Sequence, residues 1–136
     1  MTRVLIPFSE PQGAARAVSM LIAEAPDRRT TVHLLAAVEP RVSGKVVLYV
    51  SPAHAETLVR AAAERWLAPL EAALAAAGIP YTSEIVVGPT KATLRDAAAR
   101  ADVDRVLLTE ATYRGLSQRQ RGRIKQRSRH SVTPVV

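Results

Sequence analysis

The sequence contains no cysteine, which excludes disulfide bonds, thiolate nucleophiles and cysteine-based zinc ribbons. Aromatic side chains make up only 4% of the 136 residues, so small aliphatic side chains must fill the core. No apolar run approaches the ~20 residues that span a bilayer, and we expect no membrane association. Residues 1–8 lack a signal-peptide pattern, from which we expect a cytoplasmic protein.

Acidic residues are missing from the C-terminal part of the chain. Residues 111–136 hold seven Lys or Arg and no Asp or Glu, whereas residues 1–110 hold 12 of each sign. The net charge of +7 therefore belongs to what we call the basic segment, residues 114–129, with Arg114, Arg119, Arg121, Arg123, Lys125, Arg127 and Arg129. A neutral body with such a segment favours a local anion site, and a solvated helix face is the alternative.

Short apolar runs alternate with Ala-rich stretches of helical periodicity. Runs typical of buried strands lie at residues 3–8, 31–38, 81–87 and 104–109. Helices are predicted to start at Ser9, Pro52 and Thr90, the first with a Ser9–Gln12 capping box and the second ending at Gly78. The second helix should bury one stripe, formed by Leu58, Ala62, Trp66, Leu70 and Leu74.

This alternation predicts one domain, residues 1–136, with an α/β fold. We expect a three-layer, doubly wound parallel sheet of the Rossmann-like type with strand order 3-2-1-4-5. Residues 134–136 fit the start of its fifth strand. Residues 45–50 fit either a short edge strand or an ordered loop.

Four segments, taken in order, resemble the universal stress protein family over essentially the whole chain. They are residues 4–8, residues 76–88 with Gly78-Ile79-Pro80, residues 97–108 with Asp104 before an aliphatic strand, and the closing Arg129-His130 and Pro134-Val135. The resemblance implies the adenine nucleotide alpha hydrolase-like variant of the Rossmann-like fold.

The nucleotide motif of the family is altered here. ATP-binding members carry Asp after strand one and a Gly-x2-Gly-x9-Gly-Ser/Thr loop after strand four, whose backbone N–H groups approach phosphates closely. Ser9 stands at the Asp position, and Glu110 and Tyr113 stand at the first two glycines. If the spacing is allowed to shift by one residue, Gly122 falls on the third glycine, and Arg123 stands where the Ser or Thr should be. The Glu110 carboxylate would repel a triphosphate, so the resemblance implies a weakened site.

The positions that match the family's pocket are Pro7, Phe8, Ser9, Val38, Thr109, Glu110, Tyr113, Arg114, Gly122 and Arg123. We expect no resident cofactor, with ATP or another adenine nucleotide as the alternative. His33, His54 and His130 lack metal-ligand spacing, so no metal is expected. Asp102 and Asp104 are better explained as turn-forming residues than as a general acid–base pair, and no catalytic residue is assigned.

We therefore predict a regulatory or interaction protein of the stress response, not an enzyme, with weak or lost nucleotide binding. It should form a homodimer through exposed apolar strips at residues 46–50 and 135–136, and contact a further protein partner. One alternative is an ATP-binding member with a rearranged, Arg-rich phosphate loop and slow hydrolysis. A weaker alternative is a basic nucleic-acid-binding module. We do not expect that one, because aromatics are not interleaved with the charges.

Overall fold

The computed structural model describes residues 2–24, 29–39, 52–100, 102–109, 113–127 and 132–135. Five strands and four helices are seen in this part of the chain: β1 (Thr2–Phe8), α1 (Pro11–Ala23), β2 (Thr30–Val38), α2 (Pro52–Ala76), β3 (Tyr81–Val87), α3 (Thr90–Arg100), β4 (Arg105–Thr109), α5 (Gln118–Arg127) and β5 (Val132–Val135). The predicted strand at residues 45–50 lies outside the described residues.

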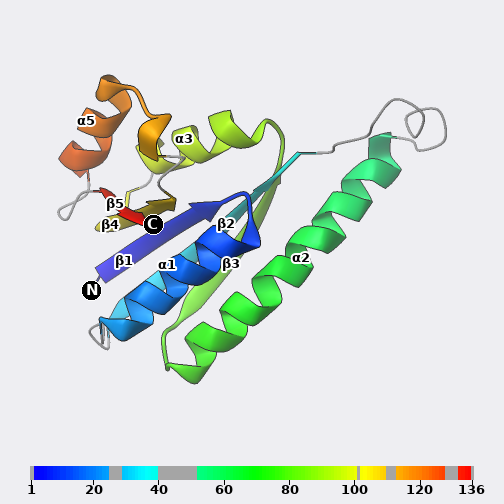
Figure 1. Ribbon diagram of the computed structural model, residues 1–136, viewed down its shortest axis with the longest axis horizontal. Coiled ribbons are helices and arrows are strands. Elements are labelled where there is room, and N and C mark those ends of the chain that lie inside the picture. The colour runs from blue at the N-terminus through cyan, green and yellow to red at the C-terminus, as the bar shows by residue number, and fades with distance from the viewer. Residues whose placement is uncertain are drawn as a thin grey trace.

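All strand pairs in the sheet are parallel, and the strand order is β3-β2-β1-β4-β5 (Figure 1). The α/β class and the parallel sheet predicted from the sequence are confirmed, as is the order of β3, β2, β1 and β4. β1 lies between β2 and β4, and β5 pairs with β4 from Val106↔Val132 to Thr109↔Val135. Because the strands are parallel, their carboxyl ends meet at one edge of the sheet, where α/β proteins bind ligands.

α1 and α2 cover one face of the sheet, which we call the first face (Figure 1). The alternate residues Val4, Ile6 and Phe8 of β1 point into this layer, each 1% exposed. α2 buries side chains at helical spacing: Ala63, Leu67, Leu70 and Leu74. Fully burying one such leucine stabilises the fold by about 1.5–3 kcal/mol, so this layer supplies most of the apolar driving force.

α3 and α5 lie on the opposite, second face (Figure 1), and the hydrophobic cluster formed there by the described residues has fewer members. Its buried members are Leu5, Leu35, Ala37, Leu94, Ala98, Val106, Leu108 and Leu116. Tyr113, from the segment that precedes α5, packs against this cluster and is partly buried. The second face is therefore closed by two short helices, of 11 and 10 residues, against 13 and 25 on the first.

The predicted capping box at Ser9 and Gln12 is wrong. α1 begins at Pro11, and its N-cap is Glu10, with φ −144° and ψ 143° and no side-chain capping hydrogen bond. A residue before proline is driven out of the helical region, so Glu10 cannot serve as the first helical residue after a Ser9 cap. Pro11 occupies the first helical position instead, where proline is favoured.

The predicted buried stripe of α2 is partly wrong. Leu70 and Leu74 are buried as expected, but the Leu58 side chain is 53% exposed, and Ala62 and Trp66 are only partly buried. The buried stripe runs instead through Ala63 and Leu67. The predicted end of this helix agrees with the structure, because Gly78 follows it with φ +73°, a value that glycine adopts without strain.

Candidate functional site

A cavity of about 400 Å³ lies at the carboxyl ends of β1 and β2. It is lined by Ser9, Ala37, Val38, Glu39, Val59, Ala62, Trp66 and Thr90. We call this the strand-end pocket. Its position follows from the topology: the chain leaves β1 into α1 and leaves β2 toward α2, so that the strand ends are left open between helices.

Backbone hydrogen bonding fixes the floor of the strand-end pocket. The N–H of Gly88, just after β3, donates to the Val38 carbonyl over 2.9 Å, which holds the end of β3 against the end of β2. Val38 itself is 4% exposed and forms an apolar surface. Thr90, at the start of α3, brings a hydroxyl to the other side.

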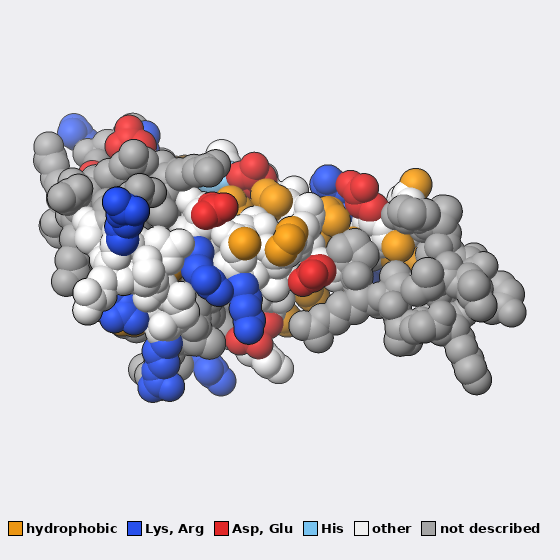
Figure 2. All heavy atoms as spheres, turned by 90° about the horizontal axis from the view of Figure 1, so that it is seen from above, with side chains coloured by type: hydrophobic (Ala, Val, Ile, Leu, Met, Phe, Trp, Pro, Cys, Tyr) orange, Lys and Arg blue, Asp and Glu red, His pale blue; other side chains and the backbone are white. Residues whose placement is uncertain are grey.

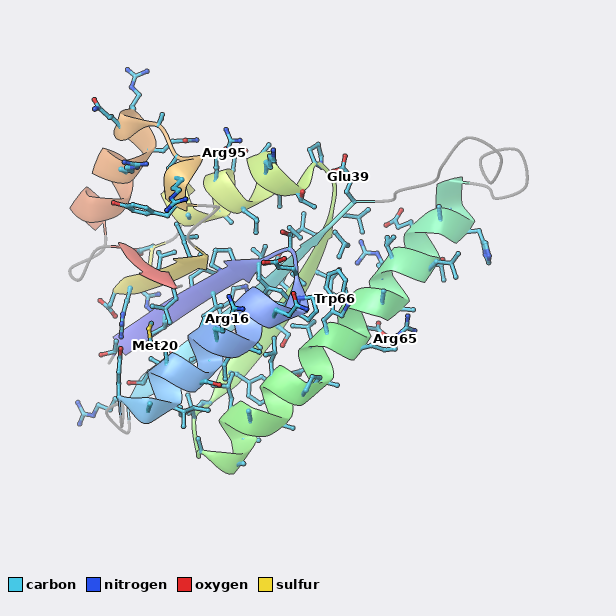
Figure 3. All side chains as sticks on the ribbon, in the orientation of Figure 1. Arg16, Met20, Glu39, Arg65, Trp66 and Arg95 are labelled. Atoms are coloured by element: carbon cyan, nitrogen blue, oxygen red, sulfur yellow. The ribbon has the colours of Figure 1, made fainter. Side chains whose placement is uncertain are left out.

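α2 supplies the apolar wall of the strand-end pocket through Val59, Ala62 and Trp66. These positions are spaced by three and four residues, so they lie along one side of the helix. In Figure 3, Trp66 stands between α2 and the start of α1, and Glu39 stands where β2 ends. The Trp66 side chain is partly buried and packs against the first-face core, which holds the indole in place.

The chemistry of this lining suits a flat, mostly apolar ligand that carries hydroxyl groups. The aliphatic and indole surfaces offer contact area to a ring system. The Glu39 carboxylate can accept hydrogen bonds from ligand hydroxyls, and Ser9 and Thr90 offer hydroxyls of their own. Among the described residues that line the pocket there is no Lys, Arg or His, so this part of the wall presents no cation to a phosphate.

Arg121 of α5 folds back onto the segment that precedes the helix. Its guanidinium carbon lies 4.6 Å from the centroid of the Tyr113 ring. Its Nη2 donates to the Tyr113 carbonyl over 3.2 Å and to the Arg114 carbonyl over 3.5 Å. We call this set of contacts the Arg121 clasp. These contacts hold α5 against the segment that follows β4, and the Arg121 guanidinium is engaged by groups of the protein itself.

Other polar residues highlighted by the sequence have structural roles. The Arg3 N–H donates to Asp104 Oδ2 over 2.8 Å, and the Asp104 N–H donates to the Arg3 carbonyl over 2.9 Å, which supports the turn interpretation. His33 Nδ1 lies 2.6 Å from Thr82 Oγ1 and its Nε2 lies 3.1 Å from Glu84 Oε1. Within the described ranges, no His, Cys, Asp and Glu side chains gather as a metal site would require.

Comparison with known proteins identifies the family. The model of the universal stress protein family matches residues 1–136. The chain belongs to this family. A search of curated proteins found no match.

In the part of the chain that the structure describes, no helix is both long and apolar enough to cross a membrane.

Solved universal stress proteins share the fold at low sequence identity. A family member from Burkholderia pseudomallei is 15% identical, with a TM-score of 0.66 over 98% of this chain and 95% of that one. One from Arabidopsis thaliana, solved with AMP bound, is 16% identical, with a TM-score of 0.61 over 99% and 91%. One from Archaeoglobus fulgidus in complex with dAMP is 13% identical, with a TM-score of 0.58 over 100% and 98%.

The positions that match the family's pocket are spread over several places. Ser9 and Val38 line the strand-end pocket, and the neighbouring Pro7 and Phe8 are buried behind them. Tyr113 and Arg114 belong to the Arg121 clasp, and Gly122 follows Arg121 inside α5. Thr109 ends β4 and Arg123 lies in α5. Glu110 lies outside the described residues.

Sequence reasoning missed most of the pocket wall. Ala62 and Trp66 were assigned to the buried stripe of α2, although they line the strand-end pocket. Glu39 directly follows the predicted strand at residues 31–38, and nothing in the sequence singles it out as a pocket residue. A signal was present: α2 carries apolar residues on two adjacent sides, at Val59, Ala62 and Trp66 as well as at the buried positions.

Proposed function

We propose that this universal stress protein is a regulatory binding protein that holds the nucleoside end of an adenine nucleotide weakly and does not grip a triphosphate. The observation that carries the proposal is the composition of the strand-end pocket. Its α2 wall is apolar, Glu39 is the group that can accept hydrogen bonds from ligand hydroxyls, and no basic side chain occurs among the described residues that line it. Such a site favours a base and sugar over phosphates.

The structural neighbours support an adenine nucleoside as the ligand. The Arabidopsis thaliana protein has AMP bound, and the Archaeoglobus fulgidus protein is in complex with dAMP. At 16% and 13% identity they share the fold with this chain, and the strand-end pocket occupies the edge where parallel α/β sheets bind ligands. Adenine can lie against Trp66 and Val38, with the ribose hydroxyls toward Glu39.

The phosphate side argues for weak binding. Where ATP-binding members have glycines, this chain has Glu110 and Tyr113. The Tyr113 side chain packs against the second-face core, and its carbonyl accepts a hydrogen bond from Arg121. Arg121 is already bound to two carbonyls and to the ring, so it cannot turn to a phosphate without breaking these contacts. This removes one of the arginines on which the alternative of an Arg-rich phosphate loop depends.

We propose binding rather than catalysis because the described part of the pocket lining offers Glu39 as its only general base and no His or Lys to activate Ser9. A regulatory protein of this kind acts through a partner, and we propose a homodimer as the acting form. The edge strands β3 and β5 each leave one row of backbone groups unpaired within the described sheet. Light scattering at micromolar concentration that finds only a monomer would contradict the dimer.

Calorimetric titration with adenosine, AMP and ATP tests the proposed ligand. We expect weak binding of all three, with affinities within about tenfold of one another, because the phosphates contribute little; tenfold corresponds to 1.4 kcal/mol. Ala62→Phe, which fills the strand-end pocket from its α2 wall, should abolish binding. Ala72→Phe is the matched control, since Ala72 is an exposed alanine on the same helix outside the pocket lining.

Two outcomes would contradict the proposal. If ATP binds with micromolar affinity and far more tightly than adenosine, the phosphates are gripped and the Arg-rich loop is the better explanation. If none of the three ligands produces heat at millimolar concentration, the strand-end pocket is not a nucleoside site.

A further inference from the structure

We propose that α5 binds the phosphodiester backbone of duplex nucleic acid, independently of base sequence. α5 has the sequence QRQRGRIKQR, in which five of the ten residues are Lys or Arg and none is acidic. Figure 2 looks onto the side of α3 and α5, and Lys and Arg side chains (blue) stand at the end that carries α5 (left). This surface is separate from the strand-end pocket and is not used by the proposed nucleoside site.

The charge pattern of α5 works against its own stability. Arg119 and Arg123, Arg121 and Lys125, and Arg123 and Arg127 are each four residues apart, and like charges at this spacing destabilise a helix. The first turn lacks the acidic residue that the helix dipole would favour and carries Arg119 instead. A bound polyanion would offset both the repulsion between the cations and the unfavourable interaction with the helix dipole. We expect this charge pattern in a helix that binds anions.

Local contacts hold α5 in place despite this repulsion. The Gln120 N–H donates to Ser117 Oγ over 3.1 Å, and the Ser117 N–H donates to Gln120 Oε1 over 2.9 Å, which forms a complete capping box. The Arg121 clasp fastens the helix to the preceding segment. One cation of the helix is thus used for anchoring, and the helix is already formed before any ligand arrives.

Three cationic positions of α5 lie on the side opposite Arg121. Positions 119, 123 and 127 follow each other at the four-residue spacing and share one side of the helix, away from position 121. Arg119, whose side chain is described, is exposed. The three positions span about 12 Å along the axis at 1.5 Å per residue. A duplex carries about seven charges over that length, so each of the three positions can meet a separate phosphate.

The composition selects nucleic acid over other anionic partners. A helix that lies on a membrane needs an apolar face, and Ile124 is the single large apolar residue in α5. The cations are four arginines and one lysine, and the planar guanidinium fork matches phosphate oxygens. The lack of interleaved aromatics, which counted against nucleic acid from the sequence, concerns stacking on single-stranded bases. Backbone contacts to a duplex do not need it.

Fluorescence anisotropy with a labelled 20-base-pair RNA duplex, and with DNA of the same sequence, tests this proposal. Binding should be weak, with a dissociation constant of about 10⁻⁴–10⁻⁶ M at physiological salt, and should strengthen as salt is lowered. RNA and DNA should bind with similar affinity. The triple variant Arg119→Gln, Arg123→Gln, Arg127→Gln should lower the slope of log K against log salt by about 2–3, since each phosphate contact contributes about 0.9.

The matched control removes the same charge from the body of the protein, through Arg16→Gln, Arg65→Gln and Lys91→Gln at exposed positions. Its salt slope should equal that of the wild type. The charge-retaining variant Arg119→Lys, Arg123→Lys, Arg127→Lys should also keep the slope, which separates lost contacts from lost folding. The proposal is overturned if the wild type binds neither duplex at 50 mM salt, or if the α5 variant and the control behave alike. Binding to phosphatidylserine vesicles in preference to both duplexes would also overturn it.

Discussion

The two faces of the sheet are closed by different means. On the first face, α1 and α2 bury a continuous aliphatic layer, in which Leu34, Ala36, Ala63 and Leu74 are completely covered. On the second face, the described residues that close the sheet are Leu94 and Ala98 of α3 and Leu116 before α5, and α5 is tied down by the Arg121 clasp and a capping box. Non-directional burial stabilises the first face, whereas specific polar contacts secure α5 on the second.

This difference separates scaffold from function. The first-face helices and the strand ends form the strand-end pocket. Because these elements pack in a large core, the pocket walls are held rigidly. The proposed nucleic-acid helix belongs to the second face, where the described hydrophobic cluster is the smaller of the two. Regions with little apolar burial open at low free-energy cost, so the second face is the better place for a surface that responds to a partner.

The largest expected effect is the loss of a leucine from the first face. Leu74→Ala should lower the free energy of unfolding by about 2–5 kcal/mol, because Leu74 is 0% exposed between α2 and the sheet. Leu94→Ala on the second face should cost less, toward the lower end of that range, since the sparser layer there can relax around the gap.

Urea denaturation of the variants measures this contrast, with Leu58→Ala as the control. Leu58 is 53% exposed on the same helix, and its loss should change stability by less than about 0.5 kcal/mol. If Leu94→Ala destabilises the protein more than Leu74→Ala does, the two faces do not differ in the way we describe.

The next effect concerns the Arg121 clasp. Arg121→Ala should lower stability by about 1–3 kcal/mol, because two carbonyl groups lose a charged donor and Tyr113 loses its cation–π partner. Arg119→Ala, two residues away and exposed, should have almost no effect on stability. Thermal unfolding of the pair checks this. Equal melting temperatures for the two variants would mean that the clasp does not hold α5.

The sequence predicted the fold best for strands that are buried on both faces of the sheet. Residues 4–8 and 34–38 are continuously apolar because these parts of β1 and β2 lie inside the sheet and are covered on both faces. β3 was found through its Ile85-Val86-Val87 end, although its first half is exposed. Periodicity placed the long helix but not its rotation: it selected Leu58 rather than Ala63, since alanine carries little weight in an apolar pattern.

The candidate site was less readable, because it depends on contacts between distant segments. The amino-acid sequence around Arg121 does not indicate whether its guanidinium contacts Tyr113, as the structure has it, or faces an anion. The same Ser-x-x-Gln pattern occurs at Ser9 and at Ser117, yet only the second forms a capping box. The difference lies in Pro11, which excludes its preceding residue from the helix. Attention to the proline would have separated the two cases.

That pair of serines provides a smaller test on each side of the sheet. Ser117→Ala should cost about 1 kcal/mol, within a range of about 0.5–2, because it removes the cap of α5. Ser9→Ala should cost less than about 0.5 kcal/mol, because Ser9 caps no helix. Circular dichroism and denaturant titration check both. A larger loss for Ser9→Ala would show that the start of α1 depends on that hydroxyl after all.

The smallest expected effect is the pH dependence of an ion pair on the first face. Arg105 of β4 contacts the Glu24 carboxylate at the end of α1, with Nη2 2.9 Å from Oε1. The hydrogen bond and the charge of Arg105 hold the pKa of Glu24 below its ordinary value. A lowered folded-state pKa means that the unfolded chain takes up the proton first. The pair therefore stabilises the fold fully above the ordinary glutamate pKa, about 4.3, and this contribution is lost as pH falls through the lowered value.

Because the Glu24 side chain is 41% exposed, solvent screening keeps the expected contribution below about 1 kcal/mol. Urea denaturation of the wild type and Glu24→Gln at pH 6 and pH 3 should show the wild type losing more stability on acidification, by about that amount. Glu64→Gln, at an exposed position of α2, is the control and should follow the wild type. If Glu24→Gln loses as much stability as the wild type between the two pH values, Arg105 does not stabilise the charged form of Glu24. The junction of α1 with β4 would then be held by burial alone, as in the rest of the first face.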